Sequence, residues 1–510
     1  MNQESRTKKT FLNARINLIF YFLTLILSFF SRKIFLAILG NDFVGLTSTL
    51  QNLLSFLNIA ELGIGTAIGY ILYKPLFDHN QQKINEIISV FGYMYQWVGK
   101  IIFISGFILS LFLPLIFQNT IFELLVIYLA YYSFLLSSLI GYFINYRQTL
   151  LSADQKQYVV TAYLQTGSII KVIIQMISAY YTGNYYLWIS IEFIYGIIHS
   201  IILNKKIDQT YPWLKSNIQE GKVLLKKYPE VIKFTKQIFI HKIGGVIQFQ
   251  LTPFLVYAFV SLQTVALYGN YSLVIDKLTL LIRNFLDSTA AGIGNLIAEG
   301  NKIKSLKVYW ELTSLRIFLI SVISFSLYTL LPMFIELWLG NEYVLSNYVL
   351  LFVILTFALN IMRGVNDQFL QAHGLFNDVW APIAESIIYI LTAIIGGYLW
   401  NLEGLLLGSI ISVFSIHYTW KPYYLFSKGF KVPTIVYWKN IFINIVFVFL
   451  SYFIFLFINE HFDFLKPIEN WMSFILYSAY VGVTITILMF ISLYLGTSGM
   501  KSFVHRIINR

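Results

Sequence analysis

The stretch NIAELGIGTAIGYILYKP, residues 58–75, joins an apolar composition to one carboxylate, Glu61, and three glycines, Gly63, Gly65 and Gly69. An ionisable side chain is costly inside a lipid bilayer, so its presence in an apolar segment points to function. Glycines in such a segment allow helices to approach closely or to bend. We therefore expect a membrane-embedded segment that takes part in function and is more than an anchor.

The rest of the chain has the composition of a polytopic membrane protein. Of its 510 residues, 57% are hydrophobic and 12% are charged, and the mean hydropathy is +0.70. Only helices and closed barrels span a bilayer, and long apolar runs favour helices. The sequence predicts an all-α fold with about fourteen transmembrane helices, at residues 15–39, 44–72, 86–117, 121–150, 158–181, 185–203, 238–261, 264–297, 307–338, 346–371, 380–400, 402–426, 436–458 and 471–495.

The basic residues follow the positive-inside rule. With the N-terminus inside, the inward loops carry nearly all of the loop lysines, whereas the outward loops hold one, Lys466. This asymmetry predicts that both termini are cytoplasmic. It also accounts for the net charge of +12, so we expect membrane lipid and no nucleic acid as a partner.

Similar features recur about 220 positions apart, which indicates an internal duplication. Pro114 matches Pro332, Gln148 matches Gln368, and the Ala67-Ile68-Gly69 segment matches Gly292-Ile293-Gly294. Because each six-span unit starts inside, the repeats are parallel, and transporters built in this way bind substrate between their halves.

These matches predict four parts of the chain. They are an N-terminal six-helix half (1–203), a basic cytoplasmic linker (204–236), a C-terminal six-helix half (237–427), and two extra helices with a cytoplasmic tail (428–510). The linker is expected either to lie on the anionic inner leaflet as an amphipathic helix or to be solvated. Two further similar segments, LGNDFV at 39–44 and LGNEYV at 339–344, lie outside the repeat register and predict only similar turn chemistry.

Three motifs carry a family resemblance. They are Arg32-Lys33-Ile34-Phe35 running to Leu39-Gly40, Ala60-Glu61-Leu62-Gly63-Ile64-Gly65, and Leu72-Tyr73-Lys74-Pro75-Leu76. They resemble the polysaccharide transporter family, the O-antigen or lipid-linked oligosaccharide flippases of the multidrug/oligosaccharidyl-lipid/polysaccharide exporter superfamily. Chain length and the 6+6+2 arrangement extend the resemblance over essentially the whole sequence.

The resemblance implies a multi-pass protein of the bacterial cytoplasmic membrane. Its function would be to move undecaprenyl-diphosphate-linked oligosaccharide repeat units from the inner to the outer leaflet for O-antigen, capsule or exopolysaccharide assembly. The implied substrate is this lipid-linked glycan, and the implied partners are other polysaccharide-assembly proteins.

An anionic diphosphate requires cations in a water-filled cavity. Basic side chains within the predicted spans are therefore the candidate substrate-binding residues, namely Lys100, Lys171, Arg283, Arg363, Arg32 and Lys33. Lys100 and Lys171 lie near mid-membrane without an acidic residue within one turn, so they line the cavity or pair with another helix, for which Glu61 is a candidate. Arg32 and Lys33 lie late in the first span, where snorkelling to the outer surface is an alternative.

Two Arg-x-x-x-Asp pairs stand in the second half. Arg283 with Asp287, and Arg363 with Asp367, have the spacing that places both side chains on one helical face. Each pair either neutralises itself as a structural element or uses its aspartate to orient a guanidinium that grips phosphate.

Glu61 allows three interpretations. It binds a coupling ion, for which a proton or sodium are candidates, or it pairs with a cation, or it accepts structural hydrogen bonds. The glycines of segment 58–75 align with Gly292 and Gly294 in the second half. The candidate cytoplasmic gate therefore consists of Gly63, Gly65, Gly69, Gly292 and Gly294.

Other functional classes are less consistent with the sequence. A multidrug or cation antiporter of the same superfamily is the alternative, although the intramembrane lysines and arginines disfavour it. The outward loops are too short for a catalytic site, and we expect no enzyme. No nucleotide-binding loop, zinc motif or nucleophile elbow occurs, so no cofactor, metal or catalytic residue is expected. His199, His241 and His417 fall near inner helix ends and are interpreted as interfacial.

Overall fold

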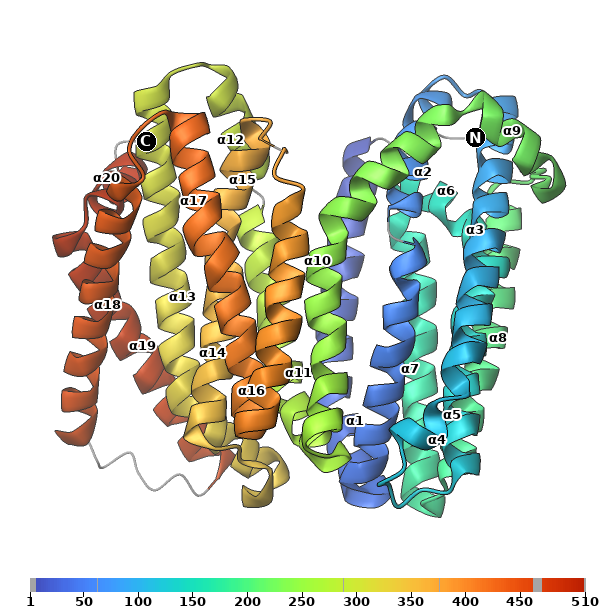
Figure 1. Cartoon of the computed structure of the whole chain (residues 1–510), viewed down its shortest axis with the longest axis horizontal. Helices are drawn as coiled ribbons and strands as arrows, with labels where there is room; N and C mark the ends of the chain where they lie inside the picture. Colours follow the sequence, from blue (N-terminus) through green and yellow to red (C-terminus); the bar gives the residue numbers. More distant parts are fainter. Residues whose placement is uncertain (1–5, 62, 288, 376, 462–469, 509–510) are drawn as a thin grey trace. The chain divides into compact units, whose positions relative to one another are not determined.

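The computed structural model describes residues 6–61, 63–287, 289–375, 377–461 and 470–508 (Figure 1). These residues form α-helices joined by short 3₁₀ and π-helical segments, and no β-strand occurs among them. They fall into two compact units, Met1–Ala266 (unit 1) and Leu267–Arg510 (unit 2). The expectation of an all-α protein is confirmed.

Unit 1 has a core rich in aromatic side chains, in which Phe43, Phe91 and Tyr131 are fully buried. Its helices are α1 (Arg6–Leu57), α2 (Ile64–Phe77), α3 (Gln81–Ser110), α4 (Leu113–Ile116), α5 (Leu124–Phe143), α6 (Gln148–Ala153), α7 (Gln157–Thr182), α8 (Tyr185–Thr210), α9 (Gly221–Lys227) and α10 (Pro229–Phe259). Three 3₁₀ segments connect them: η1 (Asn58–Glu61), η2 (Asn145–Arg147) and η3 (Ile218–Glu220). Helix α11 (Leu262–Asp287) begins in unit 1 and continues into unit 2.

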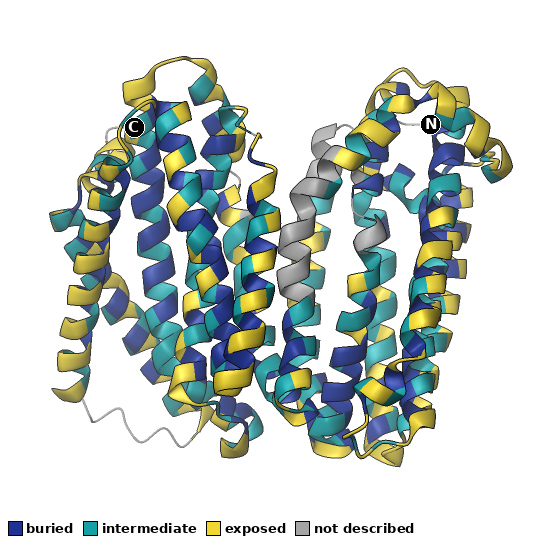
Figure 2. Ribbon diagram, viewed as in Figure 1, coloured by how far each residue is buried: buried dark blue, intermediate teal, exposed yellow. Residues whose placement is uncertain are grey.

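Unit 2 has its own core, in which Tyr309, Phe369 and Phe426 are fully buried. Its elements after α11 are α12 (Ala290–Ala298), α13 (Lys302–Leu339), η4 (Asn341–Tyr343), α14 (Asn347–Met362), α15 (Gly364–Ala372), α16 (Trp380–Val413), the π-helix η5 (Phe414–Trp420), α17 (Lys421–Tyr424), the π-helix η6 (Leu425–Phe430), α18 (Ile435–His461), α19 (Trp471–Gly496) and α20 (Ser498–Ile508). In both units, exposed residues recur along the helices (Figure 2). Many of these exposed residues have large apolar side chains, as expected where lipid is the solvent.

Eleven helices of the described residues are long and apolar enough to cross a membrane. Two of these eleven contain a break in the helical backbone. Gly40 interrupts the first, and Trp400 with Asn401 interrupts the one from Trp380 to Phe430. Both breaks fall where the sequence separates two predicted spans, 15–39 from 44–72 and 380–400 from 402–426. The total of about fourteen spans, the two repeats and the position of the termini stay predictions.

The two similar LGN segments, at 39–44 and 339–344, adopt related backbone turns. Gly40 has φ 83° and ψ 163°, and Gly340 has φ 120° and ψ 163°. Only glycine enters this region without strain. The expectation of similar turn chemistry is confirmed.

The basic linker is packed against α3. Lys215 donates its backbone N–H to Asn85 Oδ1 at 2.7 Å, and Tyr228 donates its hydroxyl to Glu86 Oε2 at 2.6 Å. A Cβ on Gly221 would lie 2.5 Å from the Ser89 carbonyl oxygen. The linker is therefore not one continuous helix, and it is anchored to α3, while Lys215, Lys222, Lys226 and Lys227 stay exposed. Whether this exposed basic face lies on the inner leaflet or in solvent stays a prediction.

The compact units also divide at a different point from the predicted halves. Helix α8 covers residues 204–210 of the predicted linker, and α10 already begins at Pro229. Since α10 packs against α1 and α2, it belongs to unit 1, and the compact units divide after Ala266. The four predicted parts of the chain stay predictions.

Candidate functional site

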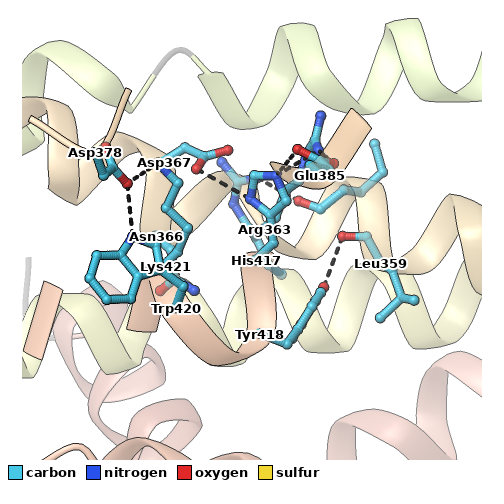
Figure 3. Close-up of polar contacts among 12 residues, drawn as sticks. Leu359, Arg363, Asn366, Asp367, Asp378, Glu385, His417, Tyr418, Trp420 and Lys421 are labelled. Carbon is cyan, nitrogen blue, oxygen red and sulfur yellow. Dashed lines mark hydrogen bonds and ion pairs between the residues drawn. The ribbon is translucent and has the colours of Figure 1, made fainter. Parts of the chain in front are cut away.

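Polar side chains of unit 2 gather where α14 gives way to α15 (Figure 3). Arg363 is the residue between these two helices, and its Nη1 lies 3.3 Å from Glu385 Oε1 on α16 and 2.9 Å from His417 Nε2 on η5. Glu385 Oε2 lies 3.2 Å from the same ring nitrogen. Three elements thus bring a guanidinium, a carboxylate and an imidazole into mutual contact, and the last two are buried.

Two further carboxylates flank this contact. Asp367 on α15 places its Oδ1 3.7 Å from His417 Nδ1. Asp378, in the loop before α16, accepts from Lys421 Nζ at 2.6 Å and from Trp420 Nε1 at 3.2 Å. Because Trp420 and Lys421 follow His417 in the chain, these bonds help to fix the π-helical segment that carries the histidine.

Arg316 on α13 reaches the same region from another side. Its side chain is 4% exposed, its Nη1 donates to the Ile361 carbonyl at 3.0 Å, and its Nη2 lies 3.7 Å from Asp287 Oδ1. A Cβ on Gly364 would overlap the Nη1 position. Glycine at 364 therefore makes room for a buried cation at the end of α14, where exposed carbonyls favour positive charge.

Arg283 and Asp287 occupy the last turn of α11. Gln368 on α15 donates to Asp287 Oδ1 at 3.3 Å and to the Leu286 carbonyl at 3.4 Å. The Arg283 guanidinium lies within the electrostatic influence of Asp287 and Arg363, yet none of the described carboxylates is within ion-pair distance of it.

The expected Arg-x-x-x-Asp pairs do not form among the described ion pairs. Asp287 faces Arg316, and Arg363 faces Glu385. The self-neutralising interpretation is corrected for a physical reason. A buried carboxylate such as Glu385 is costly without a cation, so a pair between helices is favoured over a pair along one helix.

Several residues of this cluster were not among the sequence-predicted site residues. Glu385 lies inside the predicted span 380–400, and an intramembrane carboxylate was the signal that could have found it. Arg316 was visible as a cation within a span. His417 was interpreted as interfacial, whereas it is 7% exposed and contacts three charged groups.

In unit 1, Glu61 is held by tyrosines. Tyr142 donates to Glu61 Oε2 at 2.7 Å, and Tyr95 donates to Glu61 Oε1. Gly65 lies beside this pair, since a Cβ there would be 3.5 Å from the Tyr95 hydroxyl, and Gly63 begins α2 with φ 93°. Among the described ion pairs none includes Glu61, so its observed role is that of a hydrogen-bond acceptor.

Lys171 has a partner on a neighbouring helix. Its Nζ lies 2.7 Å from Glu192 Oε1 and 5.0 Å from the Tyr195 ring centroid, and Gln175 donates to Glu192 Oε2 at 3.0 Å. Lys171 lines a cavity of about 540 Å³ between α7 and α8, whose other lining residues include several isoleucines. The cross-helix ion pair is therefore formed with Glu192 and not with Glu61.

The remaining predicted basic residues are dispersed. Lys100 is exposed and lies 5.4 Å from the Trp97 ring centroid. Arg32 is half-buried and donates to the Ala266 carbonyl at 2.8 Å, while Lys33 is exposed. The structure does not join these residues to the Arg363 cluster.

The other gate glycines share one property. A Cβ at Gly69, Gly292 or Gly294 would meet no heavy atom within 4 Å. Close packing therefore does not explain why these positions hold glycine. Their role in a gate stays a prediction.

Comparison with known proteins shows the fold alone. No protein-family model and no curated protein matches the sequence. A solved structure titled "Lipid II flippase MurJ, inward closed conformation" is similar with a TM-score of 0.62 and 17% identity, covering 96% of this chain and 99% of that chain. An inward-facing multidrug resistance MATE family transporter of the MOP superfamily is similar with a TM-score of 0.58 and 11% identity, covering 78% and 93%. This chain is thus a multi-pass membrane protein that shares its fold with a flippase and a transporter.

Proposed function

We propose that this protein is a flippase that moves undecaprenyl-diphosphate-linked oligosaccharide repeat units from the inner to the outer leaflet of the bacterial cytoplasmic membrane by alternating access. The glycan would then enter O-antigen, capsule or exopolysaccharide assembly. The observation that supports this most directly is the convergence of Arg283, Arg316 and Arg363 on one region of unit 2, within a fold shared with a lipid flippase.

Guanidinium groups suit a diphosphate because their planar donors match phosphate oxygens two at a time. Charge interactions are stronger in a region of low dielectric, which compensates part of the cost of burying cations. Arg283 is the best candidate to touch the ligand first. Arg316 already donates to a backbone carbonyl and Arg363 already contacts Glu385, whereas Arg283 has no described carboxylate in ion-pair distance.

The test is reconstitution of the purified protein in liposomes with a fluorescent prenyl-diphosphate oligosaccharide. The fraction of substrate reaching the far leaflet is measured by its access to a glycan-modifying enzyme outside. We expect Arg283→Ala to reduce the rate strongly and Arg283→Lys to restore it in part, because the charge returns without the fork geometry. Lys304→Ala, which removes an exposed pair with Glu299, is the matched control and should flip at the wild-type rate. Wild-type protein that flips no lipid-linked glycan under any condition refutes the proposal.

One observation favours a second candidate, a cation antiporter. The cluster also holds Asp287, Asp367 and Glu385, and acidic side chains suit cationic substrates. A cation antiporter should confer resistance to cationic drugs on a sensitive host, and it should lose this activity in Glu385→Gln more than in Arg283→Ala. The flippase proposal expects no such resistance.

A further inference from the structure

Both ring nitrogens of His417 face carboxylates. Nε2 lies 3.2 Å from Glu385 Oε2, and Nδ1 lies 3.7 Å from Asp367 Oδ1. Arg363 Nη1 lies 2.9 Å from Nε2 as well. The ring is buried, and Nδ1 has no hydrogen-bond partner within range.

These contacts cannot all be satisfied by a neutral imidazole. A guanidinium only donates, so the contact of Arg363 with Nε2 requires a lone pair on that nitrogen. The single ring proton is then on Nδ1, toward Asp367, and Glu385 receives no proton from the ring. A second proton on Nε2 would serve Glu385, but it would also remove the acceptor that Arg363 uses.

We propose that His417 is a proton-binding site that competes with Arg363, so that protonation releases the Arg363 guanidinium to bind an anion. An anion at Arg363 would in turn draw the guanidinium from Nε2 and favour protonation of the ring. Proton and anion binding therefore strengthen each other, as linkage requires. The proposal rests on the proposed function only for the identity of the anion, a diphosphate.

The surroundings of the ring are consistent with this exchange. On its own segment, Tyr418 donates to the Leu359 carbonyl at 2.8 Å and Lys421 is neutralised by Asp378 at 2.6 Å, so neither competes for the ring. From α11 and α13, the charges of Arg283 and Arg316 act on Asp367, and Asp287 is turned to Arg316. Arg363 is then the cation in direct contact with the imidazole, and Glu385 and Asp367 are the anions.

The backbone that carries His417 is also unusual. Residues Phe414–Trp420 form a π-helix, and such segments occur mostly at functional sites. The neighbouring carboxylates lie on α15 and α16, which are separate elements. A change in the protonation of one ring can thus alter contacts among three elements.

The experiment uses the full chain in lipid nanodiscs and two probes, inorganic pyrophosphate and sulfate, the second of which keeps its charge throughout the tested range. Affinity is measured between about pH 8 and about pH 5, the range in which histidine is the protein side chain that most commonly changes charge. Wild-type protein should bind both anions at least about fivefold more tightly at the acidic end. It should take up about one proton per anion bound, read with a pH dye in weak buffer.

His417→Gln should still bind both anions but lose the proton uptake and the sulfate pH dependence. His373→Gln, which changes a half-buried histidine of unit 2 outside the cluster, is the matched control and should behave as wild type. NMR of ¹⁵N-labelled histidines should show one ring that changes protonation when sulfate is added, and its signal should be missing in His417→Gln.

Sulfate binding with the same pH dependence in wild type and His417→Gln would overturn the proposal, as would wild-type protein that binds neither anion at any pH. These outcomes are separable from the flippase test. Proton-linked anion binding without lipid flipping refutes the proposed function alone, and lipid flipping without proton-linked anion binding refutes this inference alone.

Discussion

Lys171 on α7 and Glu192 on α8 form an ion pair of 2.7 Å with both side chains largely buried. A buried pair that loses one member leaves an uncompensated charge, which costs about 3–5 kcal/mol, whereas apolar replacement of both members is often neutral. We expect Lys171→Met to lower the unfolding temperature in detergent, and Lys171→Met with Glu192→Leu to restore it. If Lys171 is structural, the double variant also restores flipping.

A double variant that is stable and inactive would show instead that Lys171 acts on substrate. The matched control is Lys304→Met, which breaks an exposed pair and should change stability by less than about 1 kcal/mol.

Gly364 and Arg316 depend on each other, and a methyl group at 364 tests this directly. A Cβ there would overlap Arg316 Nη1, so Gly364→Ala should displace the guanidinium from the Ile361 carbonyl. Overpacking of this kind costs about 1–3 kcal/mol. We expect a lower unfolding temperature and a large loss of flipping. Gly482→Ala on α19, where a Cβ meets no atom within 4 Å, should neither lower the unfolding temperature nor reduce flipping, and equal losses in the two variants would contradict the clash at Gly364.

Substitutions at Glu61 and at its tyrosine donors test whether this carboxylate binds a coupling ion or only accepts structural hydrogen bonds. Tyr142→Phe removes one donor and should cost about 1 kcal/mol, because a partly buried carboxylate oxygen loses its hydrogen bond. Glu61→Gln keeps an acceptor oxygen but cannot bind a coupling ion. Wild-type flipping in Glu61→Gln would identify a structural acceptor. Loss of flipping with unchanged stability would identify a coupling site.

Much of the fold was predictable from local sequence, and the contacts of the site were not. Hydropathy runs place the helices because each span is a contiguous apolar segment, and the LGN glycines mark turns because positive φ favours glycine. Arg363 shows that sequence spacing alone does not predict contacts between helices. Its spacing to Asp367 suggested a pair on one helix, but the guanidinium contacts Glu385, which is 22 residues later. Only the packing of α14 against α16 brings these two side chains together.

The same limit applies to Glu61, whose hydroxyl donors come from α3 and α5. Tyrosines are abundant in this chain, with 36 in total, so composition alone could not single out Tyr95 and Tyr142. The depth of Lys171 in the membrane stays a prediction. Its carboxylate partner, Glu192, could not be identified without knowing that α7 packs against α8.

The gate glycines give the last prediction. Because a Cβ at Gly69 or Gly292 meets open space, alanine fits there without a clash and should stabilise either helix by about 0.5–1 kcal/mol. If these helix segments bend during transport, the stiffer backbone should slow flipping while the unfolding temperature stays equal or rises. Gly482→Ala is again the control, since it adds the same methyl group to a helix outside the predicted gate. A faster or unchanged flipping rate in Gly69→Ala and Gly292→Ala would remove both glycines from the gate.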